Sequence, residues 1–339
     1  MNFANFDLGR RVLVIAEIGN NHEGNFDVAL QMLERAAEAG ADAVKFQTFI
    51  AEQFVSPADP DRLMRLRGFQ LSFEQFAKLA ARARELGVVF FSTPLDLESA
   101  RFLDSIQPIF KIASGDNNFL GLIRTVAGFG KPLIVSTGFS DLPLLDQVQA
   151  EVRAVWKTRG IDPGLAFVHC VSCYPVPPAQ ANLAAIGTLR SRFPDCAIGY
   201  SDHTTGIDAA AYAVAAGARI IEKHFTLDKN YSSFRDHQLS ADPDDLRRLV
   251  ARVREVEELL GNGAREPQQC ELASIAAVRR SLAAARDLPA GTALAPADLI
   301  CVRPGSGFAP GSEAQLLGRR TSRALTAGTL IQASDLAAN

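Results

Sequence analysis

The chain has 339 residues, enough for one large domain and a small second one. Hydrophobic residues make up 47% of it and charged residues 22%, the balance of a globular protein with a large core. The net charge of −3 and the lack of a basic run argue against nucleic acid as a partner. No window approaches the roughly 20 apolar residues of a membrane span, and the N-terminus lacks a signal peptide's apolar segment. We therefore expect a cytoplasmic protein without a membrane partner.

Short apolar, β-branched runs alternate with amphipathic segments over about the first 260 residues. The runs predict eight strands, at Val12–Gly19, Asp42–Gln47, Val88–Thr93, Ile109–Ser114, Pro132–Thr137, Leu165–Val171, Ala197–Asp202 and Arg219–Phe225. The amphipathic segments predict helices that include Asp27–Ala39, Phe73–Leu86, Leu183–Phe193 and Pro243–Leu260. Eight strands, each followed by a helix, are typical of an α/β protein with a (β/α)8 TIM barrel. An open doubly wound sheet is disfavoured because no GxGxxG follows the first strand.

A different pattern begins after Leu260. A short, polar segment with Gly and Pro is typical of a linker. It is followed by two near-repeats, DLPAGTAL and ALTAGTLI, each of which predicts a turn within short strands. We therefore predict a catalytic barrel over 1–262, a linker over 263–279, and a small, mostly β domain over 280–339.

Polar residues at the C-terminal strand ends are the candidates for the active site, because TIM barrels place their chemistry there. Glu17, Lys45 and Lys111 put charges into otherwise apolar runs, and the two lysines are among only seven in the chain. A single strand lysine is equally compatible with a structural ion pair. Together with the hydroxyl groups at the ends of neighbouring strands, however, the lysines predict a pocket for a compact polyanion such as a phosphate ester. Those hydroxyl residues are Thr93, Ser114, Ser136 and Ser201.

His203 and His224 stand at the ends of two neighbouring predicted strands. Neutral imidazoles in such positions bind a divalent metal and leave coordination sites open for water and substrate. Taken alone, a histidine pair more often indicates hydrogen-bonded core residues. Beside a polyanion pocket and Glu17, the pair predicts a catalytic ion, with Mn²⁺ favoured and Mg²⁺ or Co²⁺ as alternatives.

Several longer phrases resemble, in the right order, the sialic acid (nonulosonic acid) synthase family. They are IAEIGNNHEGNFDVALQMLERAAEAGADAVKFQTF, FFSTPLDLESA, FKIASGDN, GKPLIVSTG, IGYSDHTTG and IEKHFTLDKN. The VRPGSG segment with ALTAGTLI resembles that family's C-terminal SAF, or antifreeze-like, domain. The resemblance runs from residue 12 to the end of the chain, and the pairing of the two domains is itself distinctive.

The resemblance implies a metal-dependent synthase that condenses phosphoenolpyruvate (PEP) with an amino sugar of the N-acetylmannosamine type. The products would be a nonulosonic, sialic-type acid and phosphate, which is released by cleavage of the C–O bond of PEP. The implied PEP-binding residues are Lys45, Thr93, Lys111, Ser114, Ser136 and Ser201. The implied metal ligands are His203 and His224, and Glu17 would lie close to the reacting atoms.

For the sugar, the resemblance implies contacts from Gln47, Tyr174 and Asp236. Arg303, in the VRPGSG loop, matches an arginine that the small domain contributes to a partner subunit's barrel. The resemblance therefore implies a domain-swapped homodimer. Lys45, Lys111, Glu17, His203, His224 and Asp236 are the residues expected to carry the catalysis.

The segment Tyr231–His237 departs from the family, in which many members carry a Pro-Gly-Pro-Asp-like sequence before the acidic residue. Ser172 also stands where some sialic acid synthases carry Asn. Both departures lie where the sugar is expected. N-acetylmannosamine, its 6-phosphate and a diacetamido-trideoxy hexose all remain open as the acceptor. Arg235 is compatible with a phosphate on the sugar, although a surface arginine is the commoner case.

Other functions are compatible with parts of the pattern. An enzyme that joins PEP to an aldose phosphate, as the heptulosonate and octulosonate phosphate synthases do, is disfavoured by the SAF-like domain. A Schiff-base aldolase would use Lys45 or Lys111 as its nucleophile. A non-catalytic binding module would have lost its barrel site, yet the charged and histidine residues are all present.

Overall fold

The computed structural model describes residues 2–3 and 6–338. The chain forms two compact units, residues 1–261 and residues 262–339. Within the described residues, no helix combines the length and the apolar character that crossing a membrane requires.

The first unit is built on eight parallel strands, and each begins and ends within two residues of its predicted bounds. They are β3 (Leu13–Gly19), β4 (Ala43–Thr48), β5 (Val89–Pro94), β6 (Phe110–Ile112), β7 (Leu133–Ser136), β8 (Leu165–Cys170), β9 (Ala197–Asp202) and β10 (Ile220–His224). The hydrogen-bonded order is β5-β4-β3-β10-β9-β8-β7-β6, so the first strand of the series pairs with the last. This pairing wraps the sheet into a barrel and confirms the predicted TIM-barrel architecture.

The seam between β5 and β6 has a different kind of connection. In the described part of the chain no ladder joins these two strands. Instead, the buried side-chain amide of Gln107 accepts a hydrogen bond from the Ser92 N–H (2.7 Å) and donates one to the Ser92 carbonyl (3.2 Å). The amide thus satisfies backbone groups that a neighbouring strand would otherwise pair.

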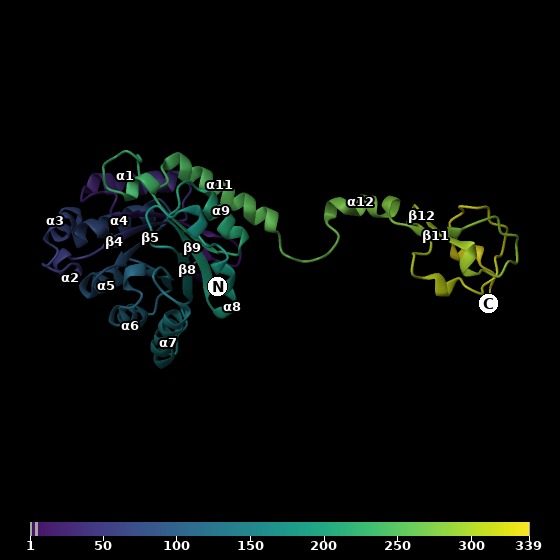
Figure 1. The fold of residues 1–339 in the computed structure, drawn as a ribbon, viewed down its shortest axis with the longest axis horizontal. Helices are drawn as coiled ribbons and strands as arrows, with labels where there is room; N and C mark the ends of the chain where they lie inside the picture. Colours follow the sequence, from purple (N-terminus) through teal and green to yellow (C-terminus); the bar gives the residue numbers. More distant parts are fainter. Residues whose placement is uncertain (1, 4–5, 339) are drawn as a thin grey trace. The chain divides into compact units, whose positions relative to one another are not determined.

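Helices surround the strands (Figure 1). They are α1 (Phe26–Glu38), α2 (Ala51–Phe54), α3 (Pro60–Phe69), α4 (Phe73–Glu85), α5 (Leu97–Asp104), α6 (Leu120–Gly128), α7 (Leu142–Arg159), α8 (Ala185–Arg192), α9 (Asp208–Ala215), α10 (Asp236–Leu239) and α11 (Pro243–Leu260). Local sequence explains their ends. Ser72 and Gln75 form a capping box at the start of α4. Gly40 and Gly217 follow α1 and α9 with φ angles of +91° and +104°, which L-residues with a side chain rarely adopt.

The alternation of side chains along the strands separates two apolar regions. Outward-facing residues pack against the helices in the larger core, which includes Val14, Phe46 and Ile221. Inward-facing residues fill the lower part of the barrel, where Leu13, Phe91 and other apolar side chains meet Phe3 from an N-terminal pair of short strands. These two strands, β1 (Asn2–Phe3) and β2 (Phe6–Asp7), were not predicted. The filled lower half means that only the upper end of the barrel is available for polar chemistry.

The second unit contains helix α12 (Gln269–Val278) and the antiparallel strands β11 (Ser281–Ala284) and β12 (Leu299–Val302). This helix lies in the segment predicted as a linker and was not predicted from the sequence. The near-repeats pair with each other through a bridge between Leu288 and Leu325. A small core of leucines and Ile331 holds this unit together, as expected for the predicted SAF-like domain.

Candidate active site

Four buried charged side chains form a continuous network inside the upper barrel. Lys45 Nζ lies 2.7 Å from Glu17 Oε2, and Lys111 Nζ lies 3.1 Å from both carboxylate oxygens of Glu222. A further distance of 3.8 Å, from Lys45 Nζ to Glu222 Oε2, joins the two pairs. All four side chains are at least 94% buried. Two cations therefore face two anions away from bulk water, where their interaction is strong.

Strand alternation explains why these side chains meet. Glu17, Lys45, Lys111 and Glu222 each follow an inward-facing apolar residue two positions earlier, on β3, β4, β6 and β10. Each of these strands thus changes from apolar to charged towards its C-terminal end. The first three were predicted from the sequence, and Glu222 was not. The signal was present, because Glu222 lies within an otherwise apolar run and shares the face of His224.

Burial and the attraction between opposite charges shift the pKa values of these four groups in opposite directions. Burial raises the pKa of Glu17 above its usual value, despite the neighbouring Lys45. Burial acts to lower the pKa of Lys45, but Glu17 and Glu222 outweigh it and the net shift is upward. Burial lowers the pKa of Lys111. For Glu222, burial is outweighed by Lys111 and Lys45, so its pKa is lowered. Glu222 is thus the fixed anion and Glu17 the carboxyl closer to exchanging a proton.

A cavity of about 440 Å³ opens above this network. It is lined by five of the six residues predicted to bind PEP, namely Lys45, Lys111, Ser114, Ser136 and Ser201. The sixth, Thr93, is not among the lining residues and instead accepts a hydrogen bond from Lys45 Nζ at 3.2 Å. Ser201 Oγ donates to Glu222 at 2.8 Å. We call this space the inner cavity.

Glycine makes the close packing of the inner cavity's wall possible. A Cβ atom on Gly138 would lie 2.3 Å from Ser172 Oγ and 2.6 Å from Ser114 Oγ. The Asn117 side chain donates to the carbonyls of Ser136 (3.2 Å) and Gly138 (2.7 Å). Together these contacts hold the hydroxyl groups of two strand ends on the same side of the cavity.

His203 and His224 lie beside each other, with ring centroids 5.2 Å apart, and both line the inner cavity. His203 Nδ1 is 2.9 Å from the Val171 carbonyl, which leaves its Nε2 for another partner. The buried Nδ1 of His224 has no hydrogen-bond partner among the described residues. Burial lowers the pKa of His224 well below its usual value, so its imidazole is neutral.

Burial acts to lower the pKa of His203, but its contacts with Cys170 and with the Val171 carbonyl outweigh it and the net shift is upward. His203 Nε2 and the unpartnered Nδ1 of His224 are the ring nitrogens that fit a divalent ion. Within the described part of the chain, no group of three or more His, Cys, Asp or Glu side chains is placed to hold a metal ion. An ion held here would take its remaining ligands from water or substrate, as catalytic ions do.

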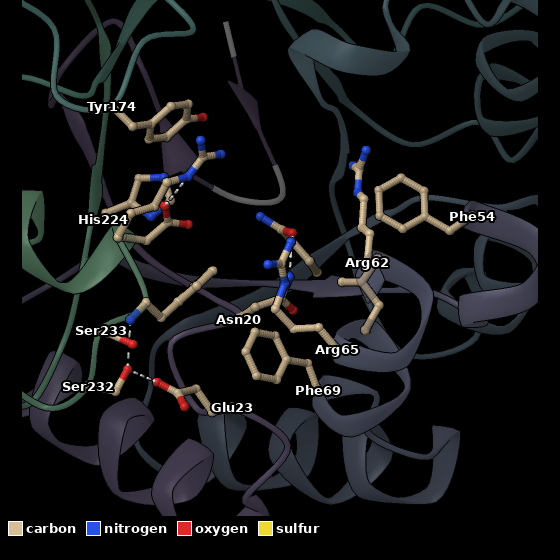
Figure 2. A pocket seen from close by; sticks show the side chains of 15 residues that line it. Asn20, Glu23, Phe54, Arg62, Arg65, Phe69, Tyr174, His224, Ser232 and Ser233 are labelled. Carbon is tan, nitrogen blue, oxygen red and sulfur yellow. Dashed lines mark hydrogen bonds and ion pairs between the residues drawn. The ribbon is translucent and has the colours of Figure 1, made fainter. Parts of the chain in front are cut away.

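A larger cavity of about 900 Å³ adjoins the inner one. It is lined by all three barrel residues predicted to handle the sugar, Gln47, Tyr174 and Asp236. Figure 2 shows Tyr174 and His224 on the same side of this cavity. Gln47, Tyr174 and His224 line both cavities, so the two spaces meet beside the histidine pair. We call this second space the outer cavity. A two-part substrate site, with a compact anion below and a longer polar molecule above, suits this arrangement.

Residues 232–236, within the segment Tyr231–His237, form one wall of the outer cavity. The position of this segment is set from below by Glu23, whose carboxylate accepts a hydrogen bond from Ser232 Oγ and lies 3.0 Å from His237 Nε2. The Arg235 guanidinium lies over the Tyr174 ring, 4.7 Å from its centroid, and 3.4 Å from Asp236 Oδ1. Arg235 thus faces the cavity and contacts two of the predicted sugar-binding residues.

Three further cavity residues were not identified from the sequence. Asp116 lines the inner cavity just beyond Ser114, and burial raises its pKa to about 6. Arg62 and Arg65 enter the outer cavity from helix α3. The order SGDN after a strand was a usable signal for Asp116. No local pattern marked the two arginines, which look like the exposed face of an ordinary helix.

Arg303 belongs to the second unit. Its Nε donates to the Val278 carbonyl at 2.7 Å, at the C-terminal end of α12. The predicted role of Arg303 at a partner subunit's barrel stays a prediction.

Family models match most of the chain. The model of the NeuB family matches residues 32–265, and that of the SAF domain matches residues 279–337. The chain belongs to the NeuB family. This confirms the resemblance to the sialic acid synthases and the presence of an SAF domain.

Named relatives of this NeuB-family chain are synthases. It is 38% identical to N,N'-diacetyllegionaminic acid synthase of Legionella pneumophila over 334 residues, 94% of this chain and 92% of that protein. It is 34% identical to N-acetylneuraminate-9-phosphate synthase of Mus musculus over 322 residues, 91% of this chain and 88% of that protein. The crystal structure of a sialic acid synthetase from Leptospira borgpetersenii has a TM-score of 0.73 and 35% identity, covering 78% of this chain and 90% of that chain. The chain is therefore an enzyme of the sialic acid synthase type.

Proposed function

We propose that the enzyme condenses PEP with an open-chain amino sugar of the N-acetylmannosamine type, forming a nonulosonic acid and inorganic phosphate. The observation that carries the proposal is the position of Lys45 and Lys111 beneath the inner cavity, with the histidine pair at its boundary to the outer cavity. A small polyanion and a carbonyl compound would meet at that boundary. Family membership supports the same reaction class.

The reaction forms one bond between carbons and breaks one between carbon and oxygen. C3 of PEP joins the aldehyde carbon of the sugar, and water adds to C2. The C2–O bond to phosphate then breaks, which leaves a keto acid. Of the two protons of water, one ends on the former aldehyde oxygen and the other on the released phosphate.

The charged network supplies the electrostatic part of this reaction. Lys45 and Lys111 would bind the phosphate and carboxylate of PEP, assisted by the hydroxyl groups of Ser114, Ser136 and Ser201. Positive charge develops at C2 as the new bond forms. Glu17, whose pKa is raised by burial, would stabilise that charge and accept a proton from the water that attacks C2.

His203 and His224 would hold the divalent ion, for which Mn²⁺ is favoured and Mg²⁺ or Co²⁺ are alternatives. When bound, the ion would act as a Lewis acid on the sugar's carbonyl group. Gln47, Tyr174 and Asp236 would orient the sugar, since they line the wall next to His224.

The dimer and the cellular location are also proposals. Arg303 would reach the active site of a partner subunit, so that each SAF domain covers the other chain's barrel. A planar guanidinium there would bind the sugar's acyl group and exclude water. A cytoplasmic location suits an enzyme that consumes PEP.

Product analysis tests the proposal directly. Phosphate should be released from PEP only when an amino-sugar acceptor is present, and mass spectrometry should detect the corresponding keto acid. In H₂¹⁸O the released phosphate should stay unlabelled, because the bridging oxygen leaves with it. Labelled phosphate would instead indicate attack at phosphorus and would overturn the proposed C–O cleavage.

A further inference from the structure

Two arginines of helix α3 line the outer cavity without a carboxylate partner. The side chains of Arg62 and Arg65 form no ion pair or hydrogen bond with another residue of the described chain. Arg62 lies over the Phe54 ring, 5.5 Å from its centroid. Arg67, farther along the same helix, is by contrast bound to Glu52 at 2.6 Å. The arginines that face the cavity are thus available to a ligand, and the one beyond them is not.

The helix holds these arginines in a defined place. Arg62 and Arg65 are three residues apart and share one face of α3, while Leu63 and Leu66 are buried in a small apolar cluster. The helix begins at Pro60, and the Asp59 side chain accepts a hydrogen bond from the Arg62 N–H. Figure 2 shows both arginines rising from α3 on the side of the cavity opposite Tyr174 and His224.

A backbone contact fixes α3 against the loop after β3. A Cβ atom on Gly24 would lie 1.9 Å from the carbonyl oxygen of Gly68, so only glycine permits this approach. Gly24 also has a φ angle of +81°, which favours glycine. This contact packs the C-terminal part of α3 closely against the loop that follows the strand carrying Glu17.

In the outer cavity the carboxylates have partners, but two of the arginines do not. Its two carboxylates already have partners, because Glu23 binds Ser232 and His237, and Asp236 lies beside Arg235. Arg62 and Arg65 therefore give the cavity a positive surface that no described side chain neutralises, whereas Arg235 is paired with Asp236. In the inner cavity, Lys45 and Lys111 already provide cations for the charges of PEP.

We infer that the acceptor sugar carries its own anionic group, a phosphate ester or a carboxylate, which Arg62 and Arg65 bind at the far side of the outer cavity from His224. Arg235, on the opposite wall, is already paired with Asp236. The inference rests on the proposed function and specifies its substrate. Guanidinium groups bind phosphate and carboxylate through paired, charge-assisted hydrogen bonds, so they discriminate strongly against a neutral hydroxyl.

The test compares three acceptors that differ only at C6: an N-acetylated hexosamine, its 6-phosphate and its 6-carboxylate. The wild-type enzyme should use one of the anionic acceptors with the higher kcat/KM. Preference for the phosphate or for the carboxylate identifies the anion, and either result supports the inference. Equal or better use of the neutral sugar would overturn it.

Arginine variants locate the anion site. Arg65→Gln is the sharper probe, because Arg65 lines only the outer cavity while Arg62 lines both. The ratio of kcat/KM for the anionic acceptor to that for the neutral one should fall at least about tenfold in R65Q, and further in R62Q/R65Q. Arg67→Gln should leave the ratio unchanged, since Arg67 binds Glu52. Thermal unfolding checks that each variant is folded.

The outcomes separate this inference from the proposed function. If PEP is consumed but the ratio does not respond to R62Q/R65Q, the anionic acceptor is wrong and the condensation reaction stands. If no acceptor of the panel supports PEP consumption, the proposed function fails and the inference fails with it.

Discussion

Lys111 and Glu222 form a buried ion pair whose two members are 111 residues apart in the chain, with Nζ 3.1 Å from both carboxylate oxygens. Glu222 also accepts a hydrogen bond from Ser201 and lies 3.8 Å from Lys45 Nζ. One carboxylate therefore contacts three of the residues proposed to bind PEP. It sets their positions before substrate arrives, which is the preorganisation that electrostatic catalysis requires.

Removing that carboxylate should destabilise the protein. Glu222→Ala leaves two lysines with a single buried carboxylate, Glu17, and we expect unfolding free energy to fall by about 3–5 kcal/mol. Glu222→Gln keeps a polar partner for Ser201, so its unfolding free energy should fall less. Glu85→Ala is the matched control, because Glu85 forms an exposed pair with Arg82 and should cost about 1 kcal/mol at most. Urea unfolding of the variants measures these differences, and equal losses for Glu222→Ala and Glu85→Ala would contradict the role of Glu222.

Two buried lysines should respond differently to substitution. Lys111→Met should lower kcat/KM for PEP at least about 100-fold, because it removes a cation from the inner cavity. Lys223→Met should mainly lower stability, because Lys223 faces the helices and pairs with Asp202 at 3.0 Å. Activity per folded molecule should stay near wild type in Lys223→Met. Phosphate-release assays combined with thermal unfolding distinguish the two effects, and comparable activity losses would argue against the separation of roles.

Loss of the histidine pair should abolish turnover without unfolding the barrel. His203→Ala and His224→Ala should each lower phosphate release by at least about 100-fold. Chelation of the wild-type enzyme should have the same effect, and added Mn²⁺ should restore activity. His169→Gln is the control, because His169 is buried elsewhere and binds the Ala181 carbonyl. Full activity in protein shown to be metal-free would defeat the metal assignment.

Asp116 should make stability depend on pH. Its pKa is raised by burial from 3.8 to about 6, so the folded state binds more protons than the unfolded state between those values. Stability therefore falls as the pH rises through this window. Asp116→Asn removes the effect and should raise the unfolding free energy by about 1–2 kcal/mol above pH 6, with little gain near pH 4. Denaturant unfolding at pH 4, 5 and 7 measures the difference between the proteins; a gain independent of pH would contradict the assignment.

The proposed exchange of SAF domains predicts complementation between defective subunits. Arg303→Ala and Lys111→Met proteins should each be nearly inactive alone. If Arg303 acts on a partner's barrel, mixed and reassembled subunits should regain up to about one quarter of wild-type activity, because random pairing forms one intact site in half of the dimers. If the mixed subunits regain no activity, Arg303 acts on the barrel of its own chain or takes no part in catalysis. Full activity after deletion of 280–339 would also refute the covering role.

The fold was largely predictable because its signals are local. Each barrel strand is a short apolar run between helix signals, and the structure places all eight within two residues of the prediction. Helix α12 was not predicted, because its residues are mostly exposed and do not form an apolar face. The N-terminal strands were also missed, since two-residue pairs leave almost no periodic pattern.

The candidate site was predictable where a single strand carried the signal. Lys45 and Lys111 are conspicuous because a charge inside an apolar run needs a partner. The identity of that partner was not readable, because Glu222 reaches Lys111 only when β10 and β6 face each other across the closed barrel. Thr93 illustrates the same limit: its strand end was identified, but it supports Lys45 instead of lining the cavity.

The sequence by itself determined the family, the barrel and most of the residues at its upper end, because alternation and strand ends are properties of short segments. Only the tertiary structure decided that Glu17, Lys45, Glu222 and Lys111 form one charge-balanced network. It also decided that Arg62, Arg65 and Arg235 surround one cavity. Both arrangements join strands, helices and loops that are distant in the chain. Their charges interact only after packing has excluded the water between them.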